Sequence, residues 1–156
     1  MRPASYLVGI AATVAAAGLL SAPAHADATG LVDGQVSAIG ATCSWTDAVT
    51  SDTPPNTLTV DHTTIDATCS GGITVTLSES PTVTFDDEAG TASSPRIIVG
   101  GTLAGLTCSY EVTNVSIARQ GTTRTYTGGP YTATKVSGSI LCPSSATVDT
   151  ATFTFH

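Results

Sequence analysis

Cysteine is the residue type in this chain with the widest choice of chemistry: nucleophile, metal ligand or half of a disulfide. A nucleophilic thiolate needs a neighbouring base, and after residue 26 the only histidines are His62 and His156. A zinc site would favour C-x-x-C or H-x-x-x-H spacing, and neither occurs. An even number of cysteines in an exported chain indicates disulfides instead, and four cysteines allow three pairings. We therefore expect no metal, no cofactor and two disulfides, formed by Cys43, Cys69, Cys108 and Cys142.

Asp61-His62 is the best candidate for a catalytic pair, because it joins a carboxylate to an imidazole. Neighbouring residues on a strand point to opposite faces, so the two side chains should not pair. The G-x-S-x-G motif of many serine hydrolases is absent. Asp86-Asp87-Glu88 lacks the spacing of a calcium loop and is typical of a hairpin turn. The sequence therefore predicts a surface histidine at position 62 and no enzyme.

Aromatic residues near glycine are the remaining candidates for recognition. Tyr126 and Tyr131 flank Gly128-Gly129-Pro130, which favours an exposed hairpin carrying two tyrosines. Such a loop can anchor a partner, so Tyr126 and Tyr131 are predicted to form a possible recognition loop. Trp45 lies two residues after Cys43, and we expect it to pack in the core rather than line a ligand surface.

Residues 1–26 have the pattern of a secretory signal peptide. One arginine precedes a run of small and apolar residues, and Ala24-His25-Ala26 fits the signal peptidase site. The apolar run is shorter than the roughly 20 residues of a membrane span. We expect a secreted, extracellular domain at 27–156, which has 156 − 26 = 130 residues and no membrane span.

The charge of this domain excludes some partners. It keeps four of the five basic residues and all 12 acidic ones, so its formal charge is 4 − 12 = −8. Nucleic-acid binding requires a basic surface, so no nucleic-acid partner is expected. The same charge should repel anionic lipid surfaces.

Apolar and polar residues alternate along most of residues 27–156. Threonine supplies 28 of these 130 residues and favours strands because it is β-branched. Glycines and prolines interrupt the alternation at short intervals, and no helical stripe is seen. The apolar phase reverses near Thr113-Asn114, which predicts a β-bulge there. The pattern predicts an all-β fold: an antiparallel β-sandwich or barrel of about eight to ten strands, with two disulfides. Each cysteine lies in the apolar phase of its strand and should face the core.

The segment CSYEVTNVSI, followed by KVSGSILCPSSATVDTATFTF, resembles the C-terminal half of a group of small secreted actinobacterial β-proteins. The shared features are C-x-Y, then S-G-S-x-L-C-P-S-S-A-T and a final alternating strand, over about residues 106–155. The resemblance implies secretion and a β fold but no activity. It also favours a Cys108–Cys142 pair, which leaves Cys43 with Cys69.

These observations predict a secreted, non-catalytic β protein with a binding, cell-envelope or structural role and an extracellular or cell-envelope partner. Two alternatives rest on similarity of size and style alone. One is a small-ligand carrier of the enediyne-apoprotein type, and the other is a secreted protease inhibitor. A deep apolar cavity would favour the carrier, and a rigid exposed loop braced by a disulfide would favour the inhibitor. A convergent Ser-His or carboxylate cluster would favour an enzyme.

Overall fold

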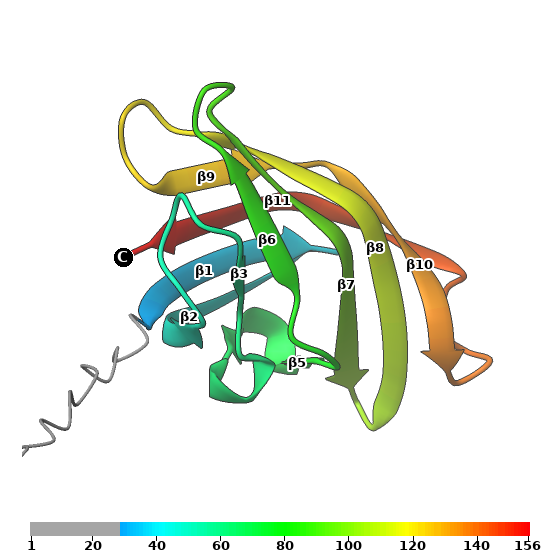
Figure 1. Cartoon of the computed structure of the whole chain (residues 1–156). Helices are drawn as coiled ribbons and strands as arrows, with labels where there is room; N and C mark the ends of the chain where they lie inside the picture. The colour runs from blue at the N-terminus through cyan, green and yellow to red at the C-terminus, as the bar shows by residue number, and fades with distance from the viewer. Residues whose placement is uncertain (1–28) are drawn as a thin grey trace, which may run out of the picture.

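The computed structural model describes residues 29–156 and consists almost entirely of strands (Figure 1). The predicted signal peptide lies outside the described residues. Two short 3-10 turns, η1 (His62–Thr64) and η2 (Ser70–Gly72), interrupt the strands. The strands are β1 (Gly30–Ala38), β2 (Ala41–Thr50), β3 (Leu58–Thr59), β4 (Thr68–Cys69), β5 (Thr74–Leu77), β6 (Thr82–Asp86), β7 (Thr91–Leu103), β8 (Leu106–Arg119), β9 (Thr125–Gly128), β10 (Tyr131–Gly138) and β11 (Ser145–Phe155).

All strands belong to one antiparallel sheet, which confirms the predicted fold class. The order is β3-β6-β7-β8-β10-β11-β1-β2-β4, with β5 beside β7, and β9 beside β11 and β8. Nine strands are longer than two residues, in agreement with the predicted eight to ten. Figure 1 shows the sheet curling strongly around its own interior.

The two edges of the sheet meet at only one end. There Thr50 bridges Val60, and the Asp61 N–H donates to the Val49 carbonyl at 2.8 Å. The Val60 N–H in turn donates to the Pro81 carbonyl at 3.0 Å, next to β6. These bonds close the sheet into a barrel at this end. At the other end, β4 pairs with β2 and β5 pairs with β7, but no hydrogen-bond ladder joins β4 to β5.

The long β7–β8 hairpin changes its inward face halfway along. Val115 and Val112 are both buried although they are three residues apart, so the predicted phase reversal is present. The predicted β-bulge is not present between these two strands, because β7 and β8 keep one register throughout. Instead Asn114 adopts a left-handed φ of 52°, which asparagine tolerates better than most residues. The residue facing it on β7 is Pro95, which has no N–H to donate.

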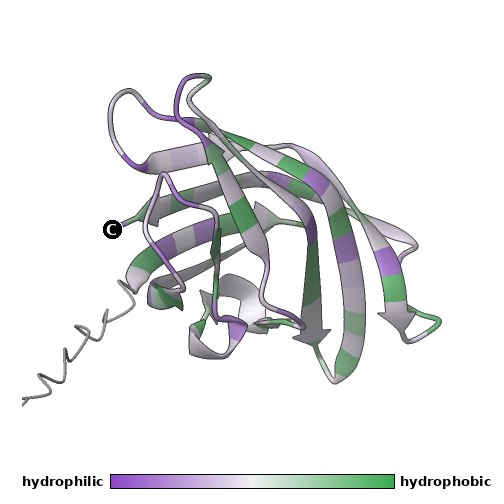
Figure 2. Ribbon diagram, in the orientation of Figure 1, coloured by the Kyte–Doolittle hydropathy of each residue, from purple (hydrophilic) through white to green (hydrophobic). Residues whose placement is uncertain are grey.

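The closed end holds the most densely buried residues. Phe155 packs edge to face on both Phe85 and Tyr126, and Phe85 packs at a tilt on Tyr126, with ring centroids 5.0–5.9 Å apart. Tyr126 is completely buried, and Val32 and Leu58 are nearly so. Figure 2 shows the resulting alternation of hydrophobic and polar residues along the strands, most clearly on β8.

Two disulfides are present, and both predicted pairs are confirmed. Cys43–Cys69 joins β2 to β4, and Cys108–Cys142 joins β8 to the loop between β10 and β11. The described residues contain no free cysteine. Both bridges lie toward the end where no ladder joins β4 to β5. Cys43 pairs with Cys69 in the β2–β4 ladder, and Cys108 pairs with Gly138 in the β8–β10 ladder. The disulfides therefore strengthen the end that hydrogen bonds leave open.

Candidate functional site: an apolar cavity

The interior of the sheet contains a cavity of about 250 Å³. Inward side chains of β1, β2, β5, β7, β8, β10 and β11 form its wall, so nearly the whole sheet contributes. A cavity of about 150 Å³ lined by aliphatic and aromatic side chains is enough to bind benzene. The space in this protein therefore suits a molecule larger than benzene.

The wall offers almost no polar chemistry. Among residues 29–156, no Asp, Glu, Lys, Arg or His lines the cavity. The hydroxyl of Tyr131 donates to the Ser116 carbonyl at 2.7 Å, and that of Tyr110 donates to the Pro143 carbonyl at 3.2 Å. Buried Ser94 donates to the Arg96 carbonyl at 3.2 Å. Since these hydroxyls are already bonded to the protein, a ligand meets mainly hydrocarbon.

Small inward residues explain why the barrel is not filled. A barrel of this size excludes voids only when bulky side chains point inward. Aromatic residues make up only 5% of this chain. Several lining positions instead carry alanine or glycine, namely Ala38, Ala41, Gly101, Ala133 and Ala146. The cavity is therefore a direct consequence of the amino acids at these inward positions.

The cavity reaches the surface near the turn between β1 and β2. Ile39, in that turn, lines the cavity yet is 69% exposed. At the opposite end the lining residues Val32, Val83 and Phe155 are buried. The cavity is therefore deep at the closed end of the barrel and opens at the end where no ladder joins β4 to β5.

Trp45 enters the cavity wall because the residue facing it is a glycine. A Cβ at Gly34 would lie only 2.0 Å from a ring atom of Trp45, so any larger residue would displace the indole. The ring packs on Phe153 at a centroid distance of 6.0 Å. Its Nε1 is buried and has no hydrogen-bond partner in the part of the chain that the structure describes. A ligand in the cavity therefore contacts the ring rather than the N–H. The predicted core packing is thus present, and Trp45 lines the cavity as well.

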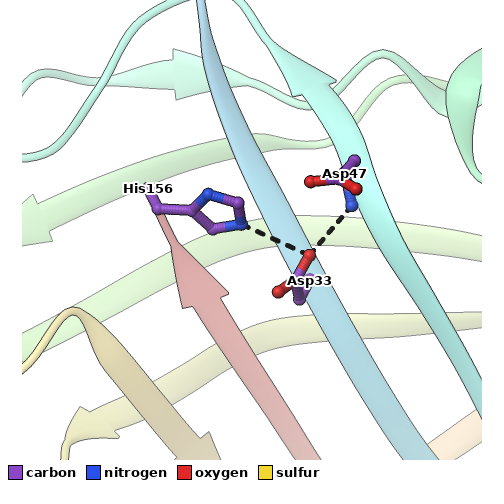
Figure 3. Close-up of side chains that lie close together, drawn as sticks. All are labelled: Asp33, Asp47 and His156. Atoms are coloured by element: carbon purple, nitrogen blue, oxygen red, sulfur yellow. Dashed lines mark hydrogen bonds and ion pairs between the residues drawn. The ribbon is translucent and has the colours of Figure 1, made fainter.

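A bulge in β2 sets the position of Trp45. The β1–β2 register shifts between Val32 and Gly34, and Asp47 adopts a left-handed φ of 56°. The Asp33 carboxylate accepts the Asp47 N–H at 2.9 Å and also lies 3.3 Å from His156 Nε2 (Figure 3). Asp33 therefore satisfies a backbone donor that the bulge would otherwise leave free.

Asp33, Asp47 and His156 also form the one cluster of three potential metal ligands in residues 29–156. All three side chains lie at the surface, and the bonds of Asp33 are explained by the bulge. The cluster therefore gives no independent indication of a metal.

The environment of Asp33 predicts a pH effect. The Asp47 N–H and, more weakly, His156 hold the pKa of Asp33 below its ordinary value of 3.8, against the opposing effect of burial. A lowered pKa in the folded state contributes stability above the ordinary pKa, and this contribution is lost as pH falls through the folded value. Asp33→Asn should therefore show a shallower loss of stability than the natural protein between about pH 5 and 2. Urea unfolding at a series of pH values measures this, and identical slopes would exclude the effect.

The predicted recognition loop is not formed. Tyr126 lies on β9 in the core and is completely buried, so the expectation of an exposed tyrosine was wrong. Tyr131 lies on β10, is half-buried and lines the cavity; burial raises the pKa of its hydroxyl. The sequence contained a signal for this, since Tyr126 alternates with Thr125 and Thr127 as an inward residue should.

His62 lies half-buried on η1 rather than on a strand. Its Nδ1 is 3.0 Å from the Ser80 hydroxyl, a Ser-His contact that sequence reasoning missed. A catalytic arrangement also needs a third group that orients the imidazole. The Asp61 carboxylate instead accepts hydrogen bonds from the N–H and the hydroxyl of Thr63. Asp61 thereby caps the start of η1. Within residues 29–156, no carboxylate is hydrogen-bonded to Nε2 of His62, and His62 does not line the cavity.

The acidic segment after β6 is a hairpin turn, as predicted. The Asp86 carboxylate accepts the Ala89 N–H at 2.9 Å. Asp87 forms ion pairs with Arg119 and Arg124, which come from the β8–β9 region. These bonds lower the pKa of Asp87, chiefly through the hydrogen bond from Arg124. The side chains of Asp86 and Asp87 are therefore engaged in structural contacts.

Comparison with protein-family models, curated proteins and solved structures gave no match for this chain. Within residues 29–156, no helix is long and apolar enough to cross a membrane. The structure itself therefore defines the class as an antiparallel β protein with two disulfides and an apolar internal cavity.

Proposed function

We propose that the protein is a secreted, non-catalytic carrier of a small, uncharged, apolar molecule. The observation that carries this proposal is the apolar cavity of about 250 Å³, which opens to solvent at one end. Pockets that bind small molecules are concave and mostly apolar, with few polar groups. The two disulfides fit an exported protein, and the pattern of residues 1–26 supports export. This is the carrier alternative, now favoured over a purely structural role.

The lining restricts the class of ligand. Burying a charged group without a partner is strongly unfavourable, and the cavity wall provides no ion to pair with it. The negative charge of the domain further disfavours carboxylates and phosphates. A neutral hydrocarbon-like or aromatic compound meets neither penalty. The carrier should therefore prefer neutral apolar ligands to anionic ones of the same size.

Two dyes that differ by one charge test this preference. N-phenylnaphthylamine is neutral, and anilinonaphthalene sulfonate carries a sulfonate on the same ring system. Fluorescence titration should show saturable binding of the neutral dye with one site per chain, and at least tenfold weaker binding of the sulfonate. Equal affinity for both dyes, or no binding of the neutral dye, would contradict the proposed ligand class.

A leucine at position 101 should block the cavity. Gly101 faces inward on β7, lines the cavity and has a strand-like φ, and a Cβ there would meet nothing closer than 4.0 Å. Gly101→Leu should therefore fold normally and weaken dye binding by about tenfold or more, or about 1.4 kcal/mol. The control is Thr76→Leu, which adds a leucine on the exposed face of neighbouring β5. If the Gly101→Leu variant bound the dye as tightly as the control, the dye would lie elsewhere.

One observation favours the protease-inhibitor alternative. The loop between β10 and β11 exposes Ile140 and Leu141 beside the Cys108–Cys142 bridge. However, the Cys142 N–H donates to the Ser139 carbonyl at 3.0 Å, so the two residues occupy a tight turn. Proteases bind their substrates as extended strands, so this turn fits their clefts poorly. Stoichiometric inhibition of a protease, abolished by Leu141→Ser, would favour the inhibitor over the carrier.

A further inference from the structure

Charge is divided unevenly between the two ends of the barrel. The four longest stretches without a charged residue in 29–156 are 34–46, 67–78, 97–110 and 136–148. They contain the β1–β2 turn, the segment from β4 to β5, the β7–β8 hairpin and the β10–β11 loop.

Strand register brings these four stretches to the same end. Ala38 pairs with Val148, so the β1–β2 turn lies beside the start of β11. The β10–β8 ladder places the β10–β11 loop next to the β7–β8 hairpin. The β7–β5 ladder places the start of β5 beside the same hairpin. Cys43, near the β1–β2 turn, pairs with Cys69, so β4 lies at the same end. We call this uncharged rim the open end.

The large exposed hydrophobic residues belong to the same end. In residues 29–156 they are Ile39, Leu103, Val136, Ile140 and Leu141, and every one lies in an uncharged stretch. Ile140 is 95% exposed and Leu141 is 73% exposed. Figure 2 shows the β7–β8 hairpin and the β10–β11 loop, two parts of this end, at the lower right. A concentration of exposed apolar side chains marks a contact surface.

The opposite end contains several ion pairs, and exposed Asp149 adjoins the uncharged stretch 136–148. The β6–β7 hairpin and the β8–β9 loop hold the Asp87, Arg119 and Arg124 ion pairs, and Asp33 with His156 lies beside the ends of β1 and β11. Lys135 is the cation next to the 136–148 stretch, and its Nζ donates to the Ser139 and Cys142 carbonyls at 3.4 and 3.3 Å. The Lys135 ammonium therefore bonds to main-chain carbonyls of this loop rather than pointing to a partner.

We propose that the open end docks on an uncharged lipid surface, so that an apolar ligand passes between lipid and cavity without crossing water. The cavity opens beside Ile39, within this apolar rim. The exposed residues are aliphatic only, whereas protein interfaces concentrate binding energy in Trp, Tyr and Arg. Apolar side chains that enter the boundary between headgroups and acyl chains give weak, reversible binding. The transfer step rests on the proposed carrier function, but the docking does not.

Vesicle flotation tests the docking. The disulfide-bonded protein should float with vesicles of phosphatidylcholine alone, and less protein should float when phosphatidylglycerol is added. Ile140→Ser combined with Leu141→Ser should lower the partition coefficient at least tenfold, and both positions are exposed enough for the fold to survive. The matched control is Ala89→Ser combined with Ala118→Ser, at exposed positions of the charged end, which should float like the natural protein.

Three results would overturn the docking proposal. The first is no flotation with phosphatidylcholine, and the second is flotation that requires anionic lipid. The third is a dimer in sedimentation equilibrium that the Ile140 and Leu141 substitutions dissolve, which would assign the open end to a second copy of this chain. Binding of N-phenylnaphthylamine by the same samples separates the two proposals: dye binding without flotation rejects docking alone, and flotation without dye binding rejects the carrier alone.

Discussion

Removing the Cys108–Cys142 bridge by alanine substitution at both positions is expected to lower the free energy of unfolding by about 3–4 kcal/mol. The bridge closes a loop with a sequence separation of 34, and without it the unfolded chain gains the entropy of that loop. Alanine is preferred to serine because Cys142 is buried, and a serine hydroxyl there would add its own desolvation cost.

Urea unfolding of the natural and bridge-free proteins measures the effect. The matched comparison is the same double substitution at Cys43 and Cys69, where the separation is 26 and the expected loss is slightly smaller. A loss below about 1 kcal/mol at both bridges would show that the unfolded chain is already constrained without them.

Tyr126→Ala is expected to lower the free energy of unfolding by about 3–5 kcal/mol, the usual cost of truncating a buried aromatic residue. Tyr126 is completely buried and packs edge to face with Phe155 and at a tilt on Phe85, at the closed end of the barrel. Truncation leaves a void between these rings, and the closed barrel has little freedom to collapse into it.

Tyr126→Phe is the control for this prediction. It keeps the ring and removes only the hydroxyl, which accepts a bond from Arg124 Nη1 at 3.2 Å. Its expected cost is about 0.5–1.5 kcal/mol. An unchanged urea midpoint for Tyr126→Ala would support an exposed tyrosine loop and contradict the burial of this residue.

The strands could be predicted from the sequence because their signal is local: threonine alternates with apolar residues along them. The pairing of the cysteines was instead favoured by the resemblance over residues 106–155. The prediction that every cysteine lies on a strand was wrong for Cys142, which lies in the loop between β10 and β11 and is buried there. The error at Tyr126 came from giving Gly128-Gly129-Pro130 more weight than the Thr-Tyr-Thr alternation before it. The glycines do adjoin a tight connection between β9 and β10, but the strand before it turns its tyrosine inward.

The cavity could not be predicted by the same reasoning. Whether small inward residues leave a void depends on the separation of the walls, which follows from the curvature of the whole sheet. The β2 bulge at Asp47 and the reversal at Asn114, opposite Pro95, contribute to that shape. Both depend on partners distant in sequence. The uncharged stretches are visible in the sequence, but only the strand register shows that they meet at one end.

The central claim is that an apolar ligand occupies the cavity, and the chain carries its own reporter for it. Trp45 is the one tryptophan in the sequence, and its ring lines the cavity. A bound N-phenylnaphthylamine molecule would lie close enough to accept excitation energy from the indole. Titration with this dye while Trp45 is excited therefore reports binding, and the comparison with Gly101→Leu assigns that binding to the cavity. The carrier proposal predicts that Trp45 emission falls to a plateau at one dye per chain and that dye emission rises in parallel. In Gly101→Leu both changes should require about tenfold or more higher dye concentration. Trp45 emission that stays constant while the dye binds, or that falls equally in Gly101→Leu, would contradict the carrier proposal.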